Sequence, residues 1–242
     1  MPVKVEQVNP YDDKRNKTSQ VEAMFDSIAP AYDFMNRAMT FGLDRLWLRS
    51  LVKAVRRSGA REIVDMATGT GDVALALARR IPGTSVTGLD LSEGMLSKAR
   101  VKAKDEKVSF RQADCLATGL PDASVDAVTV AYGVRNYADI AAGYREMARI
   151  LCPGGSVFIL ELSTPVSPLT RPLYRLYTRY IIPAVGRLVS GDSRAYSYLP
   201  ESIAAAPQRS DMTEVMTSAG LSGASFRSLS FGVCTLYTAK KL

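Results

Sequence analysis

One glycine-rich turn and its two flanking strands constrain the fold of this chain more than any other feature. Residues 63–67 form a short apolar strand pattern, the turn TGTGD follows at residues 68–72, and an alanine-rich helix pattern begins at Val73. The next expected strand, residues 85–90, ends on Asp90. A strand, a glycine turn, a helix and a second strand with a terminal acid form the unit that holds an adenosine-containing cofactor in doubly wound α/β folds.

The residues of the turn indicate which cofactor the unit holds. Gly69 and Gly71 let the backbone approach a ligand closely, and the Asp90 carboxylate is placed to accept hydrogen bonds from two ribose hydroxyls. Asp72 would repel the pyrophosphate of a dinucleotide, and Ala74 stands where a dinucleotide-binding turn has its third glycine. S-adenosylmethionine carries no phosphate, and its sulfonium and amino groups are cationic. The turn therefore predicts this cofactor and disfavours an NAD-dependent dehydrogenase.

Composition limits the remaining classes of function. The 242 residues suffice for one core, so we expect a polar leader over residues 1–18 and a single domain over residues 19–242. The chain has no histidine, which excludes a His-ligated metal, a Ser–His triad and a histidine base. Its three cysteines lack ligand-like spacing, so we predict no metal site and a reducing cytoplasm. Neither a signal peptide nor a membrane span is expected, and the net charge of +7 suits nucleic acid or a membrane surface.

Strand-like and helix-like segments alternate after the glycine turn. The expected strands cover residues 63–67, 85–90, 108–114, 125–132, 156–161, 225–230 and 233–239. They predict a doubly wound, mostly parallel seven-stranded sheet of the Rossmann-like type, with helices before it and an inserted helix before two closing antiparallel strands. In such sheets ligands bind outside the carboxyl ends of the strands, so residues 65–72, Asp90, 114–115 and 132–136 are expected to line one crevice.

The inserted segment before the last two strands combines an apolar stripe with basic residues. Apolar residues recur at helical spacing from Leu169 to Leu188, with an expected kink at Pro183, and residues 162–191 contain no acid. The arginines of this segment are Arg171, Arg175, Arg179 and Arg187. The pattern fits a helix packed on the sheet and also a helix that faces a lipid surface, and both readings stay open. A polar loop over residues 191–200 is expected to follow.

Four motifs extend over the chain from about residue 19 onward. They are VEAMFDSIAPAYDFMNRAMTFGLDRLWLR at 21–49, DMATGTGD at 65–72, AYGVRNYAD at 131–139 and AYSYLPESI at 195–203. Together they resemble the ubiquinone/menaquinone biosynthesis C-methyltransferases, which are class I S-adenosylmethionine-dependent enzymes. The resemblance implies C-methylation of a polyprenylated quinol ring, with demethylmenaquinol converted to menaquinol as the first expectation. The 2-polyprenyl-6-methoxy-1,4-benzoquinol precursor of ubiquinone is the alternative substrate.

The resemblance also implies roles for individual residues. Arg135 and Asn136 match the Arg-Asn pair beside the reacting ring, where they would stabilise a phenolate and orient a ring oxygen. The proton would leave through water, through a carboxylate such as Asp72, or through a tyrosine, and the sequence does not choose among them. The implied cofactor-binding residues are Tyr32, Asp65, Gly69, Thr70, Gly71, Asp90, Leu91, Asp114, Cys115 and Ala131.

Several of these residues have a second interpretation. Asp65 fits an anchor of the turn as well as a ligand contact, and Arg135 fits a structural ion pair as well as a catalytic role. Tyr32 is implied to cover the methionine end of the cofactor, but a core position is the alternative. Asp114 is implied to face the adenine amine. Ala131 stands where the family often has a serine, so a backbone contact would replace that hydroxyl.

Two other classes of function compete with a quinol methyltransferase. A nucleic-acid methyltransferase suits the positive charge, but AYGVR at residues 131–135 replaces the Pro-Pro-aromatic motif that follows the fourth strand in enzymes acting on base amino groups. A non-catalytic lipid-binding scaffold would not need a complete turn with Thr70 and Asp90. The expected partners are therefore a polyprenylated quinol and an anionic membrane surface, contacted peripherally from the cytoplasmic side, and no nucleic acid. A homodimer is left open.

Overall fold

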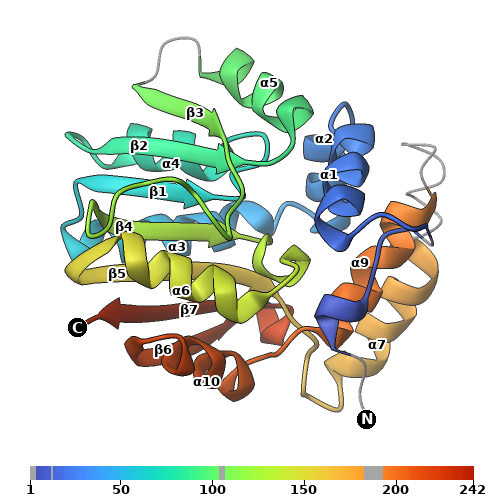
Figure 1. The fold of residues 1–242 in the computed structure, drawn as a ribbon. Helices are drawn as coiled ribbons and strands as arrows, with labels where there is room; N and C mark the ends of the chain where they lie inside the picture. The colour runs from blue at the N-terminus through green and yellow to red at the C-terminus, as the bar shows by residue number, and fades with distance from the viewer. Residues whose placement is uncertain (1–3, 12, 104–106, 183–192) are drawn as a thin grey trace.

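A seven-stranded sheet lies at the centre of the computed structural model, which describes residues 4–11, 13–103, 107–182 and 193–242 (Figure 1). The strands are β1 (Glu62–Met66), β2 (Ser85–Asp90), β3 (Val108–Gln112), β4 (Val125–Ala131), β5 (Leu151–Leu162), β6 (Leu221–Leu229) and β7 (Cys234–Lys241). Their order is β3-β2-β1-β4-β5-β7-β6. The first five pair in parallel, whereas β7 is antiparallel to β5 and β6. The predicted Rossmann-like fold is confirmed.

Helices cover both faces of the sheet, because its central strands are apolar on both sides. One face carries α3 (Asp44–Ser58) and α4 (Asp72–Arg80), and the other carries α6 (Ile140–Ile150) and α10 (Ser210–Ser218). Successive strand residues point to opposite faces. Ile63 of β1 therefore packs with α3 and α4, whereas Val64 packs with α6 and α10. A further helix, α5 (Glu93–Lys102), connects β2 with β3.

A third group of helices covers the carboxyl ends of the parallel strands. Its members are α1 (Lys17–Ile28), α2 (Tyr32–Met39), α7 (Thr170–Leu176), the π-helical turn η3 (Tyr177–Ile181) and α9 (Ser193–Ala205). Figure 1 shows these helices, in blue and orange, gathered beyond the arrowheads of β1 and β2. Met24, Met35 and Tyr198 form part of the buried cluster between them. Any ligand at the strand ends is thus enclosed between the sheet and this helical layer.

The segment after the inserted helix differs from its prediction. Residues 191–200 were expected as a polar loop, but the described part of this stretch belongs to α9, which continues through Pro200. Tyr196 and Tyr198 are buried against the helices of the N-terminal region. The helix is therefore stabilised by tertiary packing that the local pattern does not show. The expected kink at Pro183, and the pattern from there to Leu188, lie outside the described residues.

Two element boundaries also differ from the sequence expectations. Ser19 and Glu22 have the spacing of a capping box, which predicts Ser19 as the N-cap of the first helix. In the structure Asn16 is the N-cap, and its side chain accepts the Ser19 N–H at 2.8 Å. The fifth strand was expected to start at Ser156, but β5 begins at Leu151, directly after α6. A register shift between Val125 and Ala127 accommodates the glycines at the start of β5.

The expected polar leader packs on the domain at the positions the structure describes. Val5, in the 3-10 turn η1 (Val5–Gln7), is 1% exposed and joins the core cluster of α6 and α10. The buried Lys17 side chain donates from Nζ to the Val5 carbonyl at 2.5 Å and to the Arg135 carbonyl at 3.4 Å. The N-terminal region therefore contacts the backbone of the segment that carries the Arg-Asn pair.

Candidate functional site

Asp90 holds the glycine turn in place from the end of β2. One oxygen of its carboxylate accepts the Gly69 N–H at 2.7 Å, and the other accepts the Ser92 N–H at 2.9 Å. Ser92 in turn caps α5, since its hydroxyl accepts the Met95 N–H at 3.0 Å. Burial raises the pKa of Asp90, and the hydrogen bonds from the backbone oppose this shift. Because a carboxylate has about four acceptor positions, Asp90 retains acceptors for ribose hydroxyls.

Asp65 lies beneath the turn and lines neither of the two cavities found in the described part of the chain. Its two oxygens accept hydrogen bonds from the hydroxyls of Thr68 and Thr129, each at 2.6 Å. Burial raises the pKa of Asp65 from its ordinary value of 3.8 to about 7, although the threonine hydrogen bonds act in the opposite direction. This geometry favours the anchoring interpretation over direct contact with a ligand.

The raised pKa of Asp65 predicts a pH-dependent stability. Between pH 4 and 7 the folded chain keeps the Asp65 proton that the unfolded chain releases. The free energy of unfolding therefore falls as pH rises through this interval, by up to ~1.4 kcal/mol per pH unit. Urea unfolding of the parent and of Asp65→Asn from pH 4 to 8 should show the parent losing stability relative to the variant. A constant difference between the two proteins would contradict the prediction.

Gly69 and Gly71 serve different purposes. Gly69 has φ +55° and lines both cavities. Gly71, with φ +83°, lines neither, and a Cβ there would lie 2.9 Å from Phe110 Cζ and 3.0 Å from Ala99 Cβ. Its role is therefore to let the start of α4 approach β3 and α5 closely, whereas Gly69 leaves space for a ligand.

Thr70 joins the glycine turn to the N-terminal helices. Its hydroxyl donates to Asp33 of α2 at 2.5 Å and accepts from Lys102 Nζ at 2.9 Å. Lys102 also forms ion pairs with Asp33 at 2.5 Å and with Asp72 at 2.8 Å. Asp72 lines the larger cavity, but its carboxylate is already paired with an ammonium group, which weakens its case as a proton acceptor.

The connection between β3 and β4 carries Asp114 and Cys115 to the smaller cavity, which measures about 80 Å³ and is also lined by Leu91. Cys115 is buried, which raises the pKa of its thiol to about 12. Asp114 accepts the Leu116 N–H at 2.8 Å, which shapes the turn that follows. The lining residues of this cavity also include Asp90, so the predicted ribose and adenine residues do converge.

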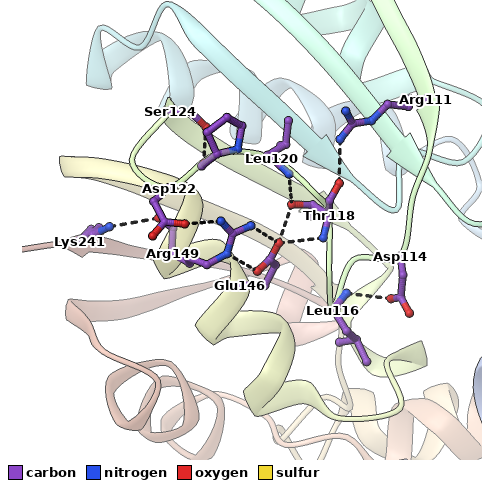
Figure 2. A network of polar contacts seen from close by, with 11 residues as sticks. Arg111, Asp114, Leu116, Thr118, Leu120, Asp122, Ser124, Glu146, Arg149 and Lys241 are labelled. Atoms are coloured by element: carbon purple, nitrogen blue, oxygen red, sulfur yellow. Dashed lines mark hydrogen bonds and ion pairs between the residues drawn. The ribbon is translucent and has the colours of Figure 1, made fainter.

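A polar network ties this connection to α6 (Figure 2). Glu146 accepts the Thr118 N–H at 2.8 Å and the Thr118 hydroxyl at 2.6 Å. Arg149 donates to Glu146 at 2.7 Å and also bonds Asp122, while Arg111 donates to the Thr118 carbonyl. Hydrogen bonds from Arg149 lower the pKa of Glu146 to about 2. The network therefore stays charged at neutral pH and fixes the segment that follows Asp114 and Cys115.

The larger cavity measures about 440 Å³ and lies between the strand ends and the helical layer. It shares wall residues with the smaller cavity, among them Tyr32, Gly69 and Ala131, so the two cavities lie next to each other. Burial raises the pKa of the Tyr32 phenol. The volume is in the range of small-molecule sites, and the wall is mostly apolar, with side chains contributed by α1, α2, α3, α7 and α9 among other segments.

The Arg-Asn pair enters this site from a short 3-10 turn, η2 (Val134–Asn136), that follows β4. The turn starts at Gly133, where a Cβ would lie 2.6 Å from Ala67 Cβ. Only glycine permits this approach, and it brings Arg135 and Asn136 beside the glycine turn. Both side chains line the larger cavity, and Asn136 also lines the smaller one.

Arg135 forms a buried ion pair with Glu161 of β5. Its guanidinium lies 2.8 Å from one Glu161 oxygen, and its backbone N–H donates to the other at 3.3 Å. The two side chains are 7% and 3% exposed, which makes the pair a desolvated one. The Arg135 Nε is buried and has no hydrogen-bond partner among the described residues. Arg135 therefore combines a place in the wall of the larger cavity with a buried donor that no described group satisfies.

Glu161 and Tyr198 were not identified as site residues from the sequence. Glu161 stands at the end of the fifth strand, as Asp90 does at the end of the second, and this shared position was the available signal. Tyr198 donates to Asn136 Oδ1 at 3.2 Å, and its place in the AYSYLPESI motif at 195–203 was the available signal. Burial raises the pKa of Tyr198 to about 12, so its phenol is a donor at neutral pH.

Comparison with known proteins identifies the family. The model of the ubiE/COQ5 methyltransferase family matches residues 13–241. The chain belongs to this family. It is 42% identical over 240 residues to a demethylmenaquinone methyltransferase of Bacteroides fragilis, with 98% of each chain covered. It is 44% identical over 241 residues to a protein of the same name from Porphyromonas gingivalis, with 98% of each covered. The UbiE C-methyltransferase of Geobacter sulfurreducens is 41% identical, with 93% of this chain and 90% of that protein covered.

Solved structures with low sequence identity share the fold of this ubiE/COQ5 family member. A chain from the complex of the Haloferax volcanii Trm112 methyltransferase activator with a methyltransferase is 20% identical, with a TM-score of 0.62, and covers 89% of this chain and 96% of its own. The Haemonchus contortus phosphoethanolamine N-methyltransferase 2 is 16% identical, with a TM-score of 0.58. The match covers 80% of this chain and 52% of that protein's chain. The family member described here is an S-adenosylmethionine-dependent methyltransferase, and the free Asp90 acceptors fit that cofactor.

Proposed function

We propose that this methyltransferase transfers a methyl group to a ring carbon of a polyprenylated quinol, converting demethylmenaquinol to menaquinol. The main structural support is the position of Arg135 and Asn136 in the wall of a mostly apolar cavity that adjoins the smaller cavity lined by Asp90. The names of the relatives from Bacteroides fragilis and Porphyromonas gingivalis favour the menaquinone precursor. The name of the Geobacter sulfurreducens relative makes the ubiquinone precursor the second candidate.

The chemistry requires a nucleophilic ring carbon held in line with the donated methyl group. S-adenosylmethionine supplies that group from its sulfonium. An aromatic carbon becomes nucleophilic when the neighbouring hydroxyl loses its proton, and the Arg135 guanidinium stabilises the resulting phenolate. Asn136 is held by Tyr198 and by the Tyr132 carbonyl, so its amide is fixed in orientation beside the ring. Alignment of the ring carbon with the donated methyl group contributes up to roughly 7–11 kcal/mol in well-oriented reactions.

The protonation and ion pairing of the candidate groups limit which of them can accept the proton of the quinol hydroxyl. Burial keeps the phenols of Tyr32 and Tyr198 protonated at neutral pH, and Asp72 is paired with Lys102. Among the three sources left open by the sequence, water in the cavity is therefore the best supported acceptor.

The decisive experiment is incubation with radiolabelled S-adenosylmethionine and defined demethylated quinols, followed by location of the label. Label on the ring carbon of demethylmenaquinol supports the proposal. Label on the benzoquinol precursor alone would show that the substrate is the ubiquinone precursor instead. Label on RNA or DNA, with none on either quinol, would refute a quinol substrate.

We also infer that the enzyme contacts an anionic membrane surface through α7 and η3. No helix among the described residues is long and apolar enough to span a bilayer. Leu173 and Leu176 are 69% and 57% exposed, which speaks against this helix being packed on the sheet. Arg171, Arg175 and Arg179 are exposed on the same segment, whereas the expected fourth arginine, Arg187, lies outside the described residues.

Neutralising the arginines of this segment is expected to weaken binding to anionic membranes. Each arginine near an anionic bilayer contributes up to ~1 kcal/mol, and salt weakens the attraction. Replacement of Arg171, Arg175 and Arg179 by glutamine should therefore abolish co-sedimentation with anionic vesicles, while cofactor affinity stays at the parent value. A matched triple variant of Arg45, Arg49 and Arg56 on α3 should retain binding. Unchanged sedimentation of the first variant would show that another surface makes the contact.

A further inference from the structure

Two phenylalanines at the rim of the larger cavity have a backbone conformation that phenylalanine rarely adopts. Phe41 follows α2 with φ +50°, and Phe231, in the 3-10 turn η4 (Ser230–Gly232), has φ +59°. Both line the cavity, yet their side chains are 78% and 84% exposed. Bulky side chains in left-handed conformations are strained, and exposing two aromatic rings to water is unfavourable as well. The fold therefore maintains two unfavourable features at one opening.

The same opening includes an exposed leucine from the arginine-bearing helix. Leu173 of α7 is 69% exposed and also lines the larger cavity. Arg171 and Arg175 of the same helix are exposed but do not line the cavity, so α7 presents positive charge to solvent near the opening and an apolar side chain at it. The Phe41 ring also contacts the Tyr177 ring of η3, with 5.6 Å between centroids. Three segments far apart in the chain thus contribute to one apolar rim.

Packing does not account for this rim. Trp47 donates from its indole nitrogen to the Ser230 hydroxyl at 2.8 Å, which anchors the turn next to Phe231. The ring of Phe231 itself remains exposed. A glycine or asparagine would make the same turn with less strain. The phenylalanine side chains are thus better explained by a partner than by folding.

We propose that Phe41, Leu173 and Phe231 form a lipid-facing mouth, which inserts into the surface of an anionic bilayer and admits the isoprenoid tail of the quinol. This rests on the proposed function and specifies where the tail of that substrate passes. The bilayer is chosen as the occupant because the apolar rim leads into a mostly apolar cavity, and because the helix that supplies Leu173 also carries exposed arginines. An aromatic ring beside basic side chains suits the boundary between acyl chains and anionic headgroups.

The test uses the double variant Phe41→Asn/Phe231→Asn. Asparagine tolerates a positive φ better than phenylalanine, so the variant should unfold at the same temperature as the parent or a higher one. Val101→Asn on α5 is the matched control, since Val101 is 64% exposed and lines neither cavity. Two quantities are measured: partition onto vesicles of phosphatidylglycerol and phosphatidylethanolamine, and the rate with tailed quinol in vesicles divided by the rate with a tail-less quinol in water.

For the double variant we expect at least a tenfold fall in that rate ratio, together with weaker partition, and no change for Val101→Asn. A parent-like ratio in a folded double variant would overturn the proposed mouth. Conversion of a dimeric parent to a monomer by the double substitution would also overturn it, because the occupant would then be a second copy of the chain. If the parent methylates neither quinol, the proposed function fails, whereas weaker partition of the variant would still support the lipid contact.

Discussion

Replacement of Glu161 by methionine is expected to lower the free energy of unfolding by about 3–5 kcal/mol, because the Arg135 guanidinium would remain buried without its carboxylate. Replacement of Arg135 by methionine should have a similar effect, because the Glu161 carboxylate would then remain buried without its partner. The double replacement removes both charges and fills a similar volume, so it should recover most of the lost stability. Urea unfolding of the four proteins measures the cycle.

Turnover separates the structural role of this pair from its chemical role. If Arg135 stabilises the phenolate as it forms, kcat should fall by roughly 10²–10³ in Arg135→Met, with cofactor affinity retained. The double variant should then be stable and still slow. A stable double variant with parent turnover would show that the arginine is structural. As a control, Glu93→Gln removes the partner of Arg100 in an exposed ion pair and should change stability far less.

The glycine turn could be predicted because its signal is local. A strand, a turn with Gly69 and Gly71, and an acid at Asp90 follow one another within thirty residues, and the structure brings them together as expected. The pairing of strands followed from the alternation of apolar strands and helices. In contrast, the sequence could not show that the two glycines have different roles. Glycine is required at position 71 because the backbone there lies close to Phe110, which is about forty residues away in the sequence.

The residues that complete the site come from distant segments and carry no local pattern. Lys102 belongs to the end of α5 and becomes relevant only because the fold places it against Thr70 and Asp33. Tyr198 lies in a stretch expected to be a loop, and its helix forms because α1 and α2 bury it. Secondary structure that depends on tertiary packing is not visible in residue periodicity. The sequence therefore indicated the surroundings of the glycine turn better than the surroundings of the Arg-Asn pair.

Replacement of Asp90 by alanine is expected to weaken binding of S-adenosylmethionine by about tenfold to over a hundredfold. The variant loses the acceptor for ribose hydroxyls, and it also loses the carboxylate that holds the Gly69 and Ser92 N–H groups. Removing a charge-assisted hydrogen bond costs roughly 1.5–3 kcal/mol, which converts to this range. Asp90→Asn keeps one acceptor of similar shape, so its affinity should lie between those of the parent and the alanine variant.

Asp126 offers a matched control for this experiment. Its carboxylate also accepts two backbone N–H groups, from Arg61 at 2.8 Å and Glu62 at 3.0 Å, but it lines neither cavity of the described structure. Asp126→Ala should therefore bind the cofactor as the parent does, even where it lowers stability. Titration calorimetry at one temperature and salt concentration compares the four proteins directly. Equal affinities for the parent and Asp90→Ala would remove Asp90 from the cofactor site, and equal losses in Asp90→Ala and Asp126→Ala would trace the effect to general destabilisation instead of ribose recognition.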